Sequence, residues 1–91
     1  MQEIIIKGFD TEVKIPKTMK RSSSGLILDG NYGYERAEWL LNNVGPGRPG
    51  LSDAYEVRRD YHVWYSQVWF GYVLYHFKRE ADATMFKLKF G

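Results

Sequence analysis

The chain has 91 residues, of which 44% are hydrophobic and 26% are charged. This length suits one compact domain and is too short for two separate hydrophobic cores, so we expect residues 1–91 to form a single domain. The composition excludes collagen-like, low-complexity and wholly disordered chains. A formal net charge of +2 is too small to indicate a general binder of polyanions.

The sequence contains no cysteine, which excludes disulfide bonds, thiolate nucleophiles and cysteine-based zinc sites. Residues 1–7 include Glu3 and a short apolar run, a pattern unlike a secretory signal. Residues 61–77 carry no formal charge and reach the lower length limit of a membrane span. Their Tyr, Trp and Val content favours a half-buried strand instead. We therefore predict a cytoplasmic protein without a membrane segment.

The first predicted element is one bent strand or a small hairpin. It contains the apolar run 4–6, and Val13 and Ile15 then alternate with polar residues until Pro16 ends the pattern. Residues 17–33 are rich in Lys, Ser, Gly and Asn, which predicts a long loop with room for one short strand.

Residues 34–44 are predicted to form a helix, and Gly45 stands where a left-handed C-terminal cap belongs. The apolar residues follow the spacing of one helical face, namely Ala37, Leu40, Leu41 and Val44. Trp39 lies roughly opposite that face, so it requires a second packing partner. The segment 45–50 contains two prolines and three glycines, which predicts a connecting turn.

A long hairpin is predicted next. Residues 54–65 alternate between apolar and polar side chains, and 68–77 is rich in β-branched and aromatic residues. Residues 66–67 would form the turn, which would place Val63 opposite Phe70.

The last segment fits two patterns. Residues 85–90 alternate as a strand would, whereas residues 79–89 have apolar residues on one helical face. We favour the helix, because acidic residues fall in its first turn and lysines in its last turn, which complements the helix dipole.

These elements together predict an α+β fold. The antiparallel sheet would contain the amino-terminal strand and the hairpin over 54–78, and the helices over 34–44 and 79–89 would cover one face. The expected topology is a two-layer, split β-α-β arrangement.

No motif in the sequence predicts catalysis or a metal site. His62 and His76 could approach each other across the hairpin, with Glu56 or Asp60 nearby, but two imidazoles without a fixed motif are weak support for a metal. We therefore predict no metal and no cofactor.

The candidate nucleophiles and phosphate-binding segments are equally weak. The serines at 22–24, with Asp29, lack a nucleophile-elbow pattern, and the segment 45–50 lacks the Gly-Lys-Ser/Thr ending of a phosphate loop. We therefore do not predict an enzyme. A basic run leads into these serines and could contact phosphate or form a solvated loop; it consists of Lys14, Lys17, Lys20 and Arg21.

The strongest functional feature is the density of aromatic rings on the predicted hairpin. A domain this small cannot bury them all, and exposed Tyr and Trp are typical anchors of protein interfaces. We therefore predict a non-enzymatic binding protein that contacts a host protein, a virion protein or its own copy. The alternative is a protein that binds single-stranded nucleic acid through aromatic and basic residues. The candidate contact residues are Trp39, Trp64, Trp69, Tyr72, Arg58 and Arg59.

The carboxyl-terminal sequence Tyr72-Val-Leu-Tyr-His-Phe-Lys-Arg-Glu-Ala-Asp-Ala-Thr-Met-Phe-Lys-Leu-Lys-Phe-Gly91 covers about a fifth of the chain. It resembles the carboxyl ends of small uncharacterised proteins of tailed bacteriophages. The resemblance implies a viral origin, and hence the cytoplasm of a host cell, but it supplies no site residues.

Overall fold

The computed structural model describes residues 2–16, 19–22, 25–28 and 32–90. The elements follow one another as β1 (Thr11–Pro16), β2 (Met19–Ser22), β3 (Gly25–Leu28), α1 (Tyr32–Asn43), β4 (Gly47–Arg48), the 3-10 helix η1 (Ala54–Glu56), β5 (Trp64–Val68), β6 (Tyr72–Phe77) and α2 (Glu80–Phe90).

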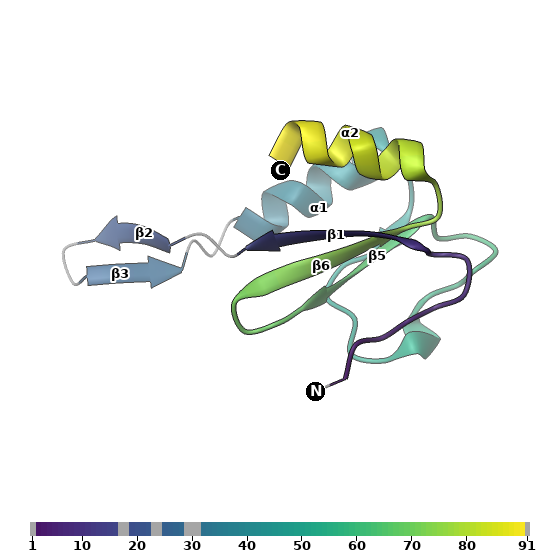
Figure 1. The fold of residues 1–91 in the computed structure, drawn as a ribbon, viewed down its shortest axis with the longest axis horizontal. Coiled ribbons are helices and arrows are strands. Elements are labelled where there is room, and N and C mark those ends of the chain that lie inside the picture. Colours follow the sequence, from purple (N-terminus) through teal and green to yellow (C-terminus); the bar gives the residue numbers. More distant parts are fainter. Residues whose placement is uncertain (1, 17–18, 23–24, 29–31, 91) are drawn as a thin grey trace.

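Four of these strands form a sheet in the order β1-β6-β5-β4, and both α-helices lie on the same side of it (Figure 1). Both β1 and β5 run antiparallel to β6, which lies between them, so β1 and β5 are parallel to each other. The connection from β1 to β5 includes α1, which is the split β-α-β arrangement. The predicted α+β class is therefore confirmed. The sheet is mixed rather than purely antiparallel, because β4 pairs with β5 in parallel.

The helices bury one face of the sheet in a shared hydrophobic core. Phe86 of α2 occupies its centre, with its ring centroid 4.6 Å from that of Tyr75 and 5.5 Å from that of Phe77. The other fully buried side chains of this core include Leu40 and Trp64. The acidic first turn and basic last turn of α2 are present as predicted, so the helix over this segment is confirmed.

Helix α1 ends where the sequence predicts. The backbone N–H groups of Val44 and Gly45 both donate to the carbonyl of Leu40, at 2.9 and 3.0 Å. Gly45 has a φ of 140°, a positive value that favours glycine and turns the chain away from the helix.

The opposite face of the sheet is covered by chain without regular strands. Gln67 of β5 accepts a hydrogen bond from the Ile4 N–H at 2.8 Å, and its side-chain amide donates to the Gln2 carbonyl at 2.9 Å. The Tyr65 hydroxyl donates to the Ile4 carbonyl at 2.7 Å. These side chains take the place of a neighbouring strand for the amino-terminal segment, which we define as residues 2–10. Residues 4–6 are therefore not part of a strand, whereas both the bent strand and the small hairpin predicted from the sequence include them in one.

The predicted hairpin differs from the structure in its limits and register. The turn lies at Phe70-Gly71 rather than at residues 66–67, and Val68 pairs with Val73. Ser66 and Gln67 look like turn residues but are buried in β5, because each bonds to a neighbouring segment; the Ser66 hydroxyl accepts from the Gly50 N–H at 3.0 Å. Polar residue types such as Ser and Gln occur both in turns and at buried positions where they bond to another segment, so residue type alone does not separate the two cases.

The first half of the predicted hairpin, residues 54–63, contains no strand. Residues 54–56 form η1 instead, because the Asp53 carboxylate accepts a hydrogen bond from the Tyr55 N–H at 2.9 Å and caps the turn. The period-two pattern of residues 54–63 is therefore a wrong prediction of a strand. Local capping overrides the alternation there.

The segment predicted as a long loop contains two short strands, β2 and β3. They pair antiparallel from Met19↔Leu28 to Ser22↔Gly25 and form a ribbon that lies apart from the four-stranded sheet (Figure 1). The predicted connector at 45–50 likewise contains β4, although the segment still links α1 to β5 as expected.

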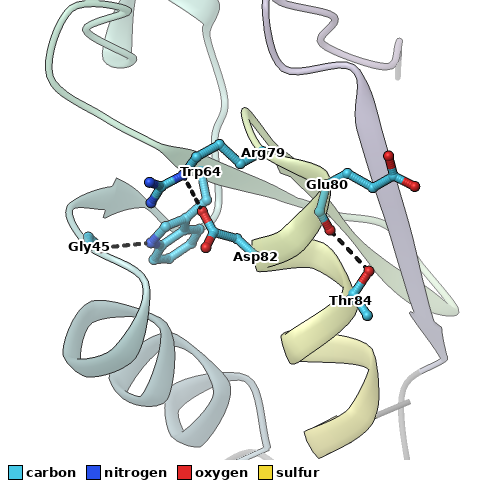
Figure 2. A network of polar contacts seen from close by, with 6 residues as sticks. All are labelled: Gly45, Trp64, Arg79, Glu80, Asp82 and Thr84. Carbon is cyan, nitrogen blue, oxygen red and sulfur yellow. Dashed lines mark hydrogen bonds and ion pairs between the residues drawn. The ribbon is translucent and has the colours of Figure 1, made fainter.

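Trp64 occupies the point where α1, β4 and β5 meet. Its side chain is completely buried, and its indole N–H donates to the Gly45 carbonyl at 3.0 Å (Figure 2). A Cβ atom on Gly47 would overlap the indole ring, so only glycine allows β4 to lie this close.

We predict that Gly47→Ala destabilises the protein by about 1–3 kcal/mol, because the added methyl group must displace the Trp64 indole or β4. Urea unfolding followed by tryptophan fluorescence measures this change. Gly71→Ala is the matched control: Gly71 has a negative φ, and among the described residues no atom lies within 4 Å of the added carbon. Equal effects of the two substitutions would contradict the prediction.

Candidate protein-binding surface

The turn between β5 and β6 carries the most exposed aromatic ring of the described residues. The Trp69 N–H donates to the Tyr72 carbonyl at 2.9 Å and closes the turn, leaving Phe70 and Gly71 at its end. The Phe70 side chain is 100% exposed. We call Val68, Trp69, Phe70 and Tyr72 the tip surface.

The two other rings of the tip surface are held in place by each other. Trp69 and Tyr72 stack with their centroids 6.0 Å apart and an interplanar angle of 15°. The Lys14 ammonium lies 4.2 Å from the centroid of the Tyr72 ring, a cation–π contact. These contacts restrict the rings, and side chains that are already restricted lose less entropy when they enter an interface.

A groove adjoins the tip surface on the helix side of the sheet. It has a volume of about 290 Å³ and lies between α1, the segment after β4 and the strands β5 and β6. Val68 belongs both to the groove and to the tip surface. The remaining lining residues are mostly apolar or aromatic and are Tyr34, Ala37, Pro49, Gly50, Ser66, Val73 and Tyr75.

The predicted tryptophan anchors have three different environments. Trp64 is completely buried in the core, so its prediction as a surface contact is wrong. Trp39 is half-buried, and its ring contacts Phe86 and Phe90 of α2 at centroid distances of 6.2 and 5.7 Å. Helix α2 is therefore the second packing partner that Trp39 requires. Only Trp69 lies on the tip surface.

The predicted arginines lie at the other end of β5. Arg58 and Arg59 precede the strand, whereas the tip surface begins at its last residue, Val68, and a strand of this length spans about 13 Å. The Arg58 side chain is exposed and 3.8 Å from Asp60. The Arg59 carbonyl accepts a hydrogen bond from the Lys78 ammonium. The structure thus separates the arginines from Trp69 and Tyr72, although all four were predicted as one contact set.

The two histidines do not approach each other as the sequence-based hypothesis of a metal site required. His62 lies before β5, where its Nδ1 accepts a hydrogen bond from the Arg58 N–H at 2.8 Å. His76 lies within β6 and stacks on Tyr65, with ring centroids 4.7 Å apart. His62 and His76 therefore do not face each other across a hairpin. Ser23, Ser24 and Asp29 lie outside the described residues, as does Lys17.

Comparison with protein-family models, with curated proteins and with solved structures found no match. The resemblance to phage proteins and the viral origin therefore stay predictions. In the parts of the chain that the structure describes, no helix is both long and apolar enough to cross a membrane.

The burial of His62, in the segment before β5, should make the stability of the protein depend on pH. Burial lowers the pKa of His62 below its ordinary value of 6.5; the Arg48 and Arg58 charges lower it further, while Asp60 raises it. Below pH 6.5 the unfolded chain therefore binds a proton that folded His62 resists. Its contribution to stability is complete above pH 6.5 and is lost as the pH falls towards the folded pKa.

We predict that His62→Asn makes the free energy of unfolding less dependent on pH. Asparagine keeps an acceptor for the Arg58 N–H but does not titrate. Between about pH 7.5 and about pH 5.5 the loss of stability should be smaller than in the unchanged protein. Urea unfolding at the two pH values measures it, and the value at the higher pH reports any direct cost of the substitution. An unchanged pH dependence would exclude this role for His62.

Proposed function

We propose that the chain is a non-enzymatic binding protein that makes protein–protein contacts through its tip surface, and that the occupant of this surface is a second copy of the chain. The complete exposure of the Phe70 ring is the observation that carries the proposal. Burying such a side chain stabilises a complex by about 1.5–3 kcal/mol. A ring at the end of a closed two-residue turn is also presented to a partner without rearrangement of the strands.

A second copy fits the tip surface because the same hairpin carries a projecting ring, Phe70, and one side of a groove that could receive such a ring. A two-fold symmetric interface requires a patch that is complementary to itself. Phe70 projects from the turn, and the groove begins at Val68, two residues earlier. The Phe70 ring of each copy would enter the groove of the other, between the Ala37 and Val73 side chains.

The separation of aromatic and basic residues disfavours the nucleic-acid alternative. Base stacking on rings is effective when cations beside them neutralise the phosphates. Lys14 is placed on Tyr72, but Arg58 and Arg59 lie at the far end of β5. This arrangement favours a protein partner over a nucleic acid.

We predict that Phe70→Ala weakens self-association about 30-fold or more, because loss of a central anchor costs about 2 kcal/mol or more. Sedimentation equilibrium over a range of protein concentrations measures the dimer dissociation constant. Tyr55→Ala is the matched control, since Tyr55 is 94% exposed but belongs to η1. It should leave the dissociation constant unchanged.

A second variant tests the groove. Val68→Asp places a charge where the groove meets the tip surface, and Val68 is already 45% exposed, so the core is not disturbed. We expect it to weaken the dimer as Phe70→Ala does. A protein that stays monomeric at all concentrations would overturn the proposal. Oligonucleotide binding that falls steeply with salt and is lost on replacing Arg58 and Arg59 would support the nucleic-acid alternative instead.

A further inference from the structure

Two carboxylates and one imidazole gather on the face of the sheet opposite the helices. The ligand atoms of Glu3, Glu12 and His76 all lie within 4.8 Å of one another. Glu12 and His76 are direct partners in the β1–β6 register, so the sheet itself sets their spacing. Glu3 arrives on the amino-terminal segment, which Gln67 and Tyr65 hold against β5 through Gln2 and Ile4.

His76 is the member of this cluster whose hydrogen bonding is incomplete. Its side chain is only 4% exposed, and within the described part of the chain its Nε2 has no hydrogen-bond partner. A buried polar atom without a partner is unfavourable. Nε2 is therefore available to a ligand held beside the carboxylates.

We propose that Glu3, Glu12 and His76 form a binding site for a divalent transition-metal ion, with zinc as the representative ion. An imidazole nitrogen and carboxylate oxygens are ligands that zinc accepts, and three protein ligands leave a fourth position for water. The Tyr65 ring stacked on His76 fixes the plane of the imidazole, and groups around metal-binding histidines usually restrict them in a similar way.

The separations are compatible with this ion. Ligands about 2.0–2.2 Å from a tetrahedral zinc ion lie roughly 3.4 Å from one another. The cluster must therefore contract from separations of up to 4.8 Å. Glu12 is exposed and Glu3 lies on an irregular segment, so both carboxylates can move towards the fixed imidazole.

The metal would join the amino-terminal segment to β1 and β6, independently of the tip surface.

The test is titration of the untagged protein with zinc chloride by isothermal calorimetry, together with cobalt(II) absorption spectra. We expect one zinc ion per chain and a visible cobalt spectrum typical of low coordination. Glu12→Gln should weaken zinc binding at least 10-fold, and Glu3→Gln should act in the same direction. Zinc at a given concentration should also raise the thermal unfolding midpoint of the unchanged protein by more than that of Glu12→Gln.

Two control variants identify the ligands. Glu38→Gln changes an exposed glutamate on α1 and should leave the zinc affinity unchanged. His62→Ala should also leave it unchanged, because His62 is not a ligand in the proposed site. The tested glutamates are not core residues, so loss of binding in their variants would not reflect unfolding. Equal zinc affinity in the unchanged protein and in Glu12→Gln, or binding that is lost only in His62→Ala, would overturn the proposal.

Discussion

The structure depends on the burial of both faces of β5. Trp64 and Ser66 face the helices, while Tyr65 and Gln67 face the amino-terminal segment, and all four side chains are buried. A strand with both faces buried needs covering layers on each side. The helices supply one layer. The other consists of irregular chain, whose backbone polar groups are satisfied by the Gln67 amide and the Tyr65 hydroxyl rather than by a strand.

The two helices can be predicted from the sequence more readily than the register of β5 with β6. Helix α1 has an apolar stripe and a terminal glycine, and α2 has charges matched to its dipole, so local pattern determines both. The register of β5 depends instead on contacts with residues more than ten positions away. Ser66 and Gln67 are polar because they bond to Gly50 and Ile4, and no local pattern distinguishes this from a turn.

The candidate sites likewise depend partly on residue types that are visible in the sequence and partly on contacts between distant residues. An excess of aromatic residues led to the prediction that Trp69 and Tyr72 contact a partner, because a domain this small cannot bury every ring. Composition cannot separate them from Trp64, which is enclosed because Gly47 lies against its indole. The grouping of Glu3, Glu12 and His76 joins two glutamates near the amino terminus to a histidine 64 positions beyond the second of them. A correct prediction of the β1–β6 register would have placed Glu12 opposite His76 and so indicated this cluster.

That pairing also determines when the sheet can be completed. Pro16 and Tyr72 are neighbours across β1 and β6 but stand 56 positions apart in the chain. On a ribosome that adds about 5–20 residues per second, β1 waits roughly 3–11 s for its partner strand to be made. The β5–β6 hairpin closes over two residues and can form within microseconds of its synthesis. Nascent β1 therefore has an unpaired edge until the hairpin emerges and provides a template for it.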